Sequence, residues 1–229
     1  MVDFHSHILP GVDHGSKSLE VSLAQLELAS KYGVKKIIST SHFYPHKHTV
    51  ESFLSSRDNA FSELKSKMSA HHPQIRLAAE VLMCDGIERL EGLERLCLEG
   101  TDFLFLEIPG NDFSSSLVDS VRRIHEKGIA KVILVHPERY SSEIIEDFLR
   151  VGVKLQINAD AFNKFFIPGR IKSWLKREKV VAIGSDIHGA NAAAYRGFSI
   201  AVKRLGKFRR YVQESSLAIW DRGNTNFKT

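Results

Sequence analysis

Three histidines and two aspartates lie within fourteen residues near the start of the chain, in DFHSHILPGVDHGS (3–16). Imidazole nitrogens and carboxylate oxygens are ligands that first-row divalent metals accept readily. His5 and His7 are two residues apart, a spacing that places both side chains on one face of a strand. The stretch therefore predicts a metal site whose remaining ligands come from other parts of the chain.

Further candidate ligands lie near the ends of short apolar runs. Glu107 lies in FLFLEIP and Glu80 in LAAEVL, where burying an unpaired carboxylate would cost several kcal/mol. Each glutamate therefore needs a cation, either a metal or an arginine. Asp186 and His188 repeat the two-residue spacing of the first pair. The candidate ligands are His5, His7, His14, His42, Glu80, Glu107, His136, Asp186 and His188.

Length and composition indicate an ordinary globular protein. The 229 residues are 43% hydrophobic and 26% charged, and we expect one domain over residues 1–229 that ends in a polar tail. No apolar run approaches the roughly 18 residues that span a bilayer. The start of the chain also lacks the basic and apolar regions of a signal peptide. These features predict a cytoplasmic protein that does not insert into a membrane.

The two cysteines exclude two further kinds of site. They are too few for a disulfide framework or a thiolate metal centre. Cysteine-dependent phosphatases place an arginine after five intervening residues, whereas Arg89 follows Cys84 one position too early. Cys97 is followed by LEGTDF, which contains no arginine. Any phosphatase chemistry must therefore use other groups.

The net charge of +5 is spread along the sequence. Its densest cluster, KRLGKFRR (203–210), is typical of the solvated face of a late helix, which we favour over a nucleic-acid surface. His71 and His72 precede Pro73 in an expected surface turn, and His125 belongs to a polar helix. His46 and His48 could approach the metal site, although a solvent-exposed role is favoured.

Periodicity predicts the elements that must position the ligands. An amphipathic helix is expected over 18–33, with Gly33 as its C-cap, while 83–101 stays unassigned. Strands are expected at 2–4, 35–41, 76–82, 102–109, 131–137, 154–159 and 180–186. Alternating strands and helices favour a parallel sheet, either closed into a barrel or open and doubly wound. The barrel is preferred because no glycine-rich phosphate loop follows the first strand. Active sites of such barrels lie at the C-terminal rim, where all the candidate ligands would converge.

With these residues in place, the chain resembles the PHP (polymerase and histidinol phosphatase) superfamily. Within it, the chain is most similar to the bacterial metal-dependent protein-tyrosine phosphatases of capsule and exopolysaccharide operons. The matching segments occur in order over residues 3–188: DFHSHILPGVDHGS, TSHFYP, AAEVL, LEIP, VHPERY, LQINA and IGSDIH. The resemblance implies a distorted seven-unit β/α barrel with three metal ions at its rim, commonly manganese.

The resemblance also implies how the ligands are shared. One metal would bind His5, His7, Glu80 and Asp186, and a second would bind Glu80, Glu107 and His136. The third would bind residue 14 together with His42 and His188. This subfamily usually has aspartate at position 14, where the present chain has His14, and Ser41 stands where proline is common. A set of imidazoles and carboxylates without sulfur suits manganese, iron or zinc.

The expected chemistry is hydrolysis of a phosphate monoester by a metal-activated hydroxide. Arg139 is predicted to take part by gripping the phosphate, although a rim salt bridge with Glu138 or another acid is an alternative. Arg196 is an approximate match to the family's phosphate-holding arginine. Aromatic residues in loops after the strands, with Phe43 and Phe162 foremost, are expected to contact substrate unless they belong to the core. The others are Tyr44, Phe113, Phe165 and Phe166.

The expected substrate is phosphotyrosine on the tail of a bacterial polysaccharide-synthesis tyrosine kinase. Two alternatives stay open at this point. One is a small-molecule phosphatase, such as one for histidinol phosphate, and the other is a non-catalytic metal-binding regulatory barrel. No nucleic-acid partner is expected.

Overall fold

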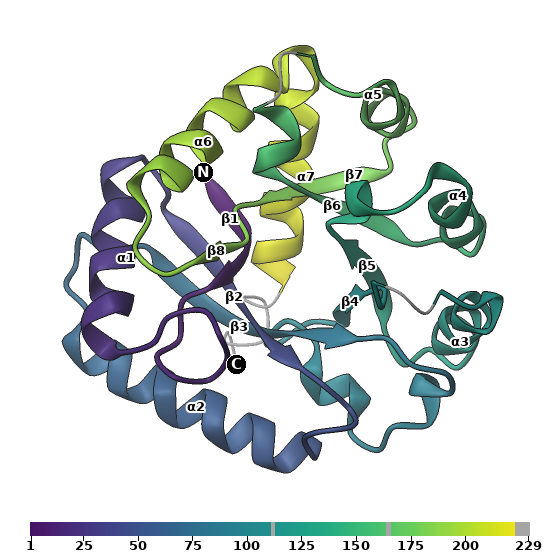
Figure 1. Cartoon of the computed structure of the whole chain (residues 1–229), viewed down its shortest axis with the longest axis horizontal. Helices are drawn as coiled ribbons and strands as arrows, with labels where there is room; N and C mark the ends of the chain where they lie inside the picture. Colours follow the sequence, from purple (N-terminus) through teal and green to yellow (C-terminus); the bar gives the residue numbers. More distant parts are fainter. Residues whose placement is uncertain (111–112, 164–165, 223–229) are drawn as a thin grey trace.

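The structure is a computed structural model that describes residues 1–110, 113–163 and 166–222. Over these residues the chain alternates strands with helices, and one parallel sheet runs through the molecule in the order β7-β6-β5-β4-β3-β2-β1-β8. The strands are β1 (Val2–His7), β2 (Lys36–Phe43), β3 (Gln74–Leu82), β4 (Phe103–Glu107), β5 (Lys131–Val135), β6 (Lys154–Asn158), β7 (Val180–Gly184) and β8 (Ile187–His188). Figure 1 shows that the sheet curls, with helices around its outer side.

The helices follow the strands in chain order. They are α1 (Leu19–Lys31), α2 (Val50–Lys67), α3 (Ser115–Glu126), α4 (Ser142–Arg150), α5 (Gly169–Lys176), α6 (Ala192–Arg204) and α7 (Arg209–Arg222). Local capping explains several of their starts: the Ser18 side chain accepts a hydrogen bond from the Val21 N–H, and the Thr49 side chain accepts one from the Ser52 N–H. The apolar sides of the helices form one large core with the outer face of the sheet.

A second apolar cluster fills the inside of the curled sheet. Phe4, Ile38, Phe105 and Val135 belong to it, and α7 contributes Trp220. Arg76, near the start of β3, donates a hydrogen bond to the Trp220 carbonyl. The last helix therefore closes the N-terminal end of the sheet, while the C-terminal ends of the strands stay open for side chains with chemical roles.

The ends of the sheet approach each other. The backbone N–H groups of Ser185 and Asp186, directly after β7, donate hydrogen bonds to the His5 carbonyl at 3.1 and 2.8 Å. The chain then continues into the two-residue strand β8, which pairs with the end of β1. The expected α/β class is confirmed, and the sheet that was expected to form a barrel is a curled parallel sheet. The expected count of seven strands omitted β8, which is too short to produce a periodic pattern.

The seven expected strands correspond to β1–β7, with ends shifted by a few residues, and the expected helix over 18–33 is α1. The unassigned stretch 83–101 contains two short 3₁₀ helices, Ile87–Arg89 and Leu93–Leu96. Among the described residues, no helix combines the length and the apolar character needed to cross a bilayer.

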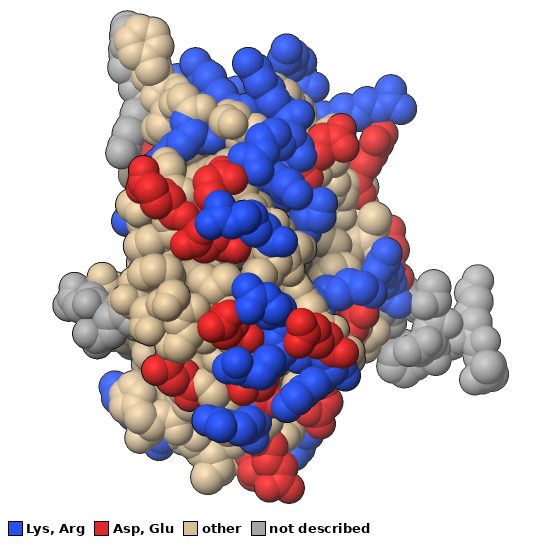
Figure 2. Space-filling model, turned by 90° about the vertical axis from the view of Figure 1, so that its right-hand side faces the viewer, with Lys and Arg blue, Asp and Glu red and all other residues tan. Residues whose placement is uncertain are grey.

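Surface charge is mixed rather than confined to one sign. In Figure 2, Lys and Arg gather at the top of the face shown and alternate with Asp and Glu below. The segment 203–210 forms the end of α6, a 3₁₀ turn and the start of α7. Its Arg210 pairs with Glu214 at 2.8 Å on the exposed side of α7. This arrangement agrees with the prediction of a solvated helical face.

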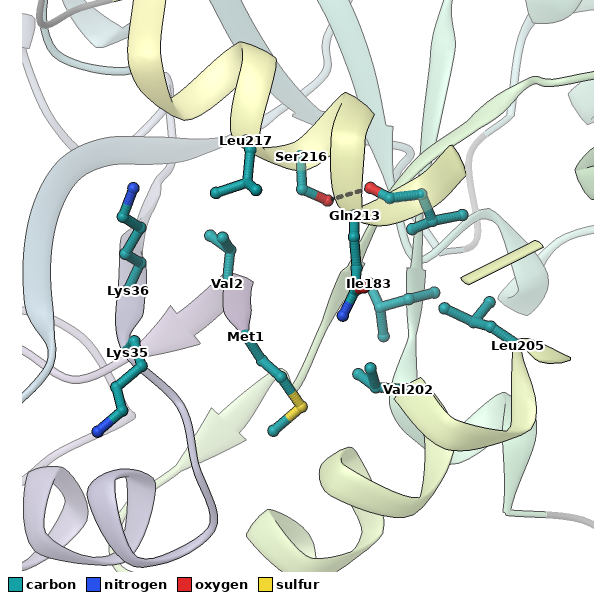
Figure 3. Close-up of a pocket in the computed structure, with 11 residues that line it drawn as sticks. Met1, Val2, Lys35, Lys36, Ile183, Val202, Leu205, Gln213, Ser216 and Leu217 are labelled. Carbon is teal, nitrogen blue, oxygen red and sulfur yellow. Dashed lines mark hydrogen bonds between the residues drawn. The ribbon is translucent and has the colours of Figure 1, made fainter. Parts of the chain in front are cut away.

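A cavity of about 280 Å³ lies between α6, α7 and the N-terminal end of the sheet. Figure 3 shows its apolar lining, including Val2, Val202 and Leu205, with Lys35 and Lys36 at one side. None of the nine predicted metal ligands contributes to this lining. The predicted ligands instead lie at the C-terminal ends of the strands.

Candidate metal centre

The C-terminal ends of the strands bring the first four predicted ligands together. His5 Nε2 lies 3.1 Å from Glu80 Oε2 and 3.5 Å from Asp186 Oδ1. His7 Nε2 lies 3.3 Å from each of the same two oxygens. Both histidines and Glu80 are fully buried. Two imidazoles and two carboxylates thus point at one another from β1, β3 and the end of β7, as a shared cation would require.

Glu80 also joins this group to its neighbours. Its Oε1 lies 2.7 Å from His136 Nε2, and its Oε2 lies 3.0 Å from His42 Nδ1. Glu107 lies near the same two histidines, with carboxylate oxygens 3.6 Å from His136 Nε2 and 4.0 Å from His42 Nδ1. A single carboxylate with both oxygens turned toward different histidines has the geometry of a ligand that bridges two cations.

The remaining predicted ligands stack at the outer side of the cluster. The ring of His14 lies 4.6 Å from each of the rings of His42 and His188. Ligand atoms of His7, His42 and His188 fall within 4.8 Å of one another. His14 is exposed and lies beside this group, but its nitrogens do not complete such a group. The structure therefore brings all nine predicted ligands into one region, with His14 at its edge.

The electrostatics of the cluster favour the charged form of Glu80 and oppose that of Glu107. Burial opposes the charge of Glu80, but His5 and the other histidines outweigh it and lower the pKa of this carboxyl well below its usual range. Burial likewise opposes protonation of His5 and His7, yet the adjacent carboxylates raise the pKa of both imidazoles. Burial raises the pKa of Glu107 to about 7, and the Glu80 charge adds to this effect.

Local backbone geometry sets the directions in which the ligand side chains point. His136 and Asp186 adopt positive φ values of 35° and 53°, a region that side chains other than glycine rarely occupy. In β1, Phe4 joins the inner apolar cluster while the next residue, His5, reaches Glu80. Successive residues of a regular strand face opposite sides, but the pairing of β1 with β2 shifts register between Asp3 and Ser6. This irregularity and the strained strand ends aim the ligands inward.

Gly184 makes room for the first histidine. A Cβ atom at position 184 would lie 2.4 Å from the Cβ of His5 and 2.5 Å from Gln156 Nε2. Gln156 in turn donates a hydrogen bond to Asn158 Oδ1, and Asn158 donates one to Asp186 Oδ2. The LQINA and IGSD segments therefore act together to hold Asp186 beside β1.

Asp13 was not predicted to have a role, yet it supports two ligands at once. Its Oδ2 accepts hydrogen bonds from His7 Nδ1 at 2.8 Å and from the His42 N–H at 3.0 Å. Its Oδ1 accepts one from the Gly15 N–H at 2.8 Å. The hydrogen bond from His7 outweighs the burial of Asp13 and lowers the pKa of its carboxyl. Because Nδ1 of His7 is held by this hydrogen bond, Nε2 is the atom that faces the cluster and would bind a cation in place of its proton.

The replacement Asp13→Asn should weaken metal binding by roughly 10- to 100-fold, the usual cost of losing a partner that orients a ligand. The amide keeps the size of the side chain but removes the charge that fixes the His7 tautomer. Metal affinity measured by calorimetry tests this expectation, with Asp58→Asn on exposed α2 as the control. Equal affinity in the wild type and in Asp13→Asn would contradict it.

Arg139 lies at the cluster, as predicted. Its guanidinium donates to Asp186 Oδ2, and its side chain is 49% exposed, so part of it faces solvent above the ligands. The predicted alternative, a rim salt bridge, thus occurs with Asp186 and does not remove the guanidinium from the site. Arg196 is an exposed residue of α6.

The predicted aromatic contacts need correction. Phe43 and Phe162 are both fully buried in the large core, and Phe43 packs edge-on against Phe53. They belong to the core because α2 packs over Phe43 through Phe53, and the 3₁₀ turn that contains Phe162 packs against α6. Phe165 lies outside the described residues. Tyr44 instead has its ring 5.3 Å from that of His42, which puts one aromatic side chain beside the ligands.

The donor set fits divalent metal ions. Nitrogens and carboxylate oxygens converge, without sulfur, from β1 to β5, the end of β7 and β8. The buried Nδ1 atom of His42, which faces Glu80, makes no hydrogen bond among the described residues. Among the described residues, four groups in this region have ligand atoms within 4.8 Å of one another: His7–His42–His188, His5–His136–Asp186, His5–His7–Glu80 and His42–Glu80–Glu107. Manganese, iron and zinc all accept such donors.

Comparisons with known proteins identify relatives of this chain. The family model described as "Capsular polysaccharide synthesis, CpsB/CapC" matches residues 1–205. The tyrosine-protein phosphatase CpsB of Streptococcus pneumoniae is 28% identical over 236 residues, covering 90% of this chain and 91% of that protein. CpsB of Streptococcus agalactiae serotype III is 27% identical over 229 residues, covering 91% and 93%.

A solved structure shares the fold. It comes from a study of YwqE from Bacillus subtilis and CpsB from Streptococcus pneumoniae, described as metal-dependent tyrosine phosphatases. The match has a TM-score of 0.75 at 18% identity and covers 97% of this chain and 95% of the other. The resemblance read from the motifs is confirmed at the level of the family. Because the family model matches residues 1–205, most of the sequence, this chain belongs to the CpsB/CapC family of capsular polysaccharide synthesis.

Proposed function

We propose that this protein is a metal-dependent phosphatase that hydrolyses phosphotyrosine in proteins. The observation that carries the proposal is the convergence of nine imidazoles and carboxylates on one open rim, with the Arg139 guanidinium beside them. The names of the relatives, tyrosine-protein phosphatase, support phosphotyrosine as the substrate. We take residues 1–229 as one catalytic domain, a distorted seven-unit barrel of the PHP type with β8 as an addition.

The proposed ligand groups follow the contacts. His5, His7, Glu80 and Asp186 would hold one divalent ion, and Glu80 would share a second with Glu107 and His136. His42 and His188 would hold a third together with His14. We propose three manganese ions, with iron or zinc as alternatives. When bound, such ions supply a nucleophilic water and neutralise charge on the phosphoryl oxygens.

The chain's own residues would position the substrate. Arg139 has the donors to orient two phosphoryl oxygens at once, because the planar guanidinium forms paired hydrogen bonds. Its bond to Asp186 keeps it next to the ligands. Tyr44, beside His42, offers an aromatic surface to the ring of the substrate. Arg196 on α6 is proposed as a further phosphate contact for a longer phosphopeptide.

The proposed partner is a tyrosine-phosphorylated protein, the tail of a bacterial polysaccharide-synthesis kinase, in the cytoplasm. The family description, capsular polysaccharide synthesis, supports this setting. His14 and His188 are exposed and the Arg139 side chain is half exposed, so the rim is open to solvent, which suits a phosphorylated peptide.

Manganese-loaded protein should hydrolyse a tyrosine-phosphorylated peptide with a higher kcat/KM than either a phosphoserine peptide or histidinol phosphate. The reason is that the open rim gives access to a long, flat side chain, and phenolate leaves readily. The double replacement Cys84→Ser, Cys97→Ser should keep activity nearly unchanged, because Cys97 is buried and burial raises the pKa of both thiols. A preference for histidinol phosphate would reject phosphotyrosine as the substrate.

A further inference from the structure

A second group of histidine and glutamate side chains lies outside the proposed centre. Glu27 projects from α1, and His71 and His72 occupy the turn between α2 and β3. Glu27 Oε1 lies 2.8 Å from His71 Nε2 and 2.9 Å from His72 Nε2. The two imidazole rings meet edge to face, with centroids 4.5 Å apart. Two nitrogens and one carboxylate oxygen therefore converge on a single point of the surface.

Neighbouring groups hold this arrangement in place. The Ser30 hydroxyl, one turn along α1, donates a hydrogen bond to the His71 carbonyl at 2.7 Å. Ser69 contacts both rings: its hydroxyl lies 2.8 Å from His71 Nδ1, and its N–H donates to His72 Nδ1 at 3.2 Å. Pro73 follows and restricts the backbone of His72 to extended conformations. The turn is thus fixed against α1 before any ligand binds.

We propose that Glu27, His71 and His72 form a separate binding site for one zinc ion. Two histidines and one glutamate are an established set of zinc ligands, with a fourth position open to water. The side chain of His72 is 4% exposed and those of His71 and Glu27 are 59% and 56% exposed, so the ion would rest on a buried imidazole and face solvent. The hydrogen bonds from His72 and His71 lower the pKa of Glu27, which keeps its carboxylate ionised.

The hydrogen bonds also indicate which ligand binds more readily. To coordinate zinc, Nε2 of each ring must give up its proton and Nδ1 must carry one. For His71 this is favourable, because Nδ1–H can donate to the Ser69 hydroxyl. For His72 the same proton shift removes the hydrogen bond that Nδ1 accepts from the Ser69 N–H, which makes His72 the weaker ligand. We therefore expect moderate affinity rather than that of a closed structural zinc site.

The site lies at the opposite end of the sheet from the proposed catalytic centre. His72 precedes β3, whereas Glu80 lies near its C-terminal end, eight residues later. At about 3.3 Å per residue, the two positions are roughly 25 Å apart. Zinc would connect α1 to the turn before β3, two segments far apart in the sequence, and would stabilise the folded chain without reaching the substrate.

Calorimetric titration of manganese-loaded protein with zinc tests this proposal. We expect the wild type to bind one more zinc ion than His71→Ala, and Glu27→Gln to bind that additional ion at least tenfold more weakly than the wild type. Glu63→Gln, which removes the same charge from exposed α2, serves as the matched control and should bind like the wild type. Cobalt as a substitute should give the visible absorption of a four-coordinate ion in the wild type and not in His71→Ala.

Zinc should also raise the melting temperature of the wild type and of Glu63→Gln, but not that of His71→Ala. Phosphatase activity should be equal in all four proteins, which separates this proposal from the proposed function. Identical zinc binding in the wild type, Glu27→Gln and His71→Ala would overturn the site. Loss of activity in the two site variants would overturn its independence from the catalytic centre.

Discussion

Replacing Glu80 with glutamine should reduce kcat/KM for a phosphotyrosine peptide by about a thousandfold. Glu80 is fully buried, and its two oxygens contact His5, His7, His42 and His136. Glutamine has the same shape but offers one neutral oxygen and an amide that repels a cation. Metal catalysis is worth several kcal/mol, and each 1.36 kcal/mol is tenfold in rate.

The measurement combines metal content after dialysis with steady-state kinetics. We expect Glu80→Gln to retain fewer ions per chain than the wild type, because the ligand proposed to be shared by two ions is lost. Chelation of the wild type should cause a comparable loss of activity, reversed by manganese. Glu88→Gln is the matched control: Glu88 is also buried but pairs with Arg123 at 2.7 Å, outside the cluster. Full metal content and activity in Glu80→Gln would refute the proposed role.

The sequence allowed most of the site to be predicted because the C-terminal ends of the strands converge in a curled parallel sheet. A carboxylate in an apolar run, as at Glu80 and Glu107, required a cationic partner. The two-residue spacing of His5 and His7 indicated that both side chains lie on one face of a strand. Each of these inferences depends on local sequence and on one general property of the fold. The structure places all of these side chains in one cluster.

Other features depend on contacts that no local pattern encodes. Asp13 lies among the predicted ligands in sequence, but its support of His42 depends on how the loop after β1 folds against β2. The direction of His5 depends on a register shift inside β1. Phe43 and Phe162 follow strand ends in the sequence, as rim aromatics would, and only the packing of neighbouring helices shows that they are core residues. Glu27 meets His71 through tertiary packing across 44 residues of sequence.

Removing the guanidinium of Arg139 should lower kcat/KM by about 10- to 100-fold without changing the metal content. Hydrogen bonds to charged groups are worth about 1.5–3 kcal/mol, which corresponds to that range. Arg139→Ala loses both the charge and the paired donors, whereas Arg139→Lys keeps the charge alone and should fall between the alanine variant and the wild type. The control is Arg122→Ala, an exposed arginine on α3 that pairs with Asp119.

Inhibition by inorganic phosphate distinguishes a phosphate contact from a structural salt bridge. If Arg139 binds the phosphoryl group, Arg139→Ala should weaken inhibition by phosphate about as much as it lowers kcat/KM. If the arginine only holds Asp186, which also accepts a hydrogen bond from Asn158 at 2.8 Å, the replacement should instead reduce metal affinity. Phosphate inhibition would then stay at the wild-type level in metal-saturated protein. That second pattern would exclude Arg139 from substrate binding, because a group that touches the phosphate must affect both the substrate and its product.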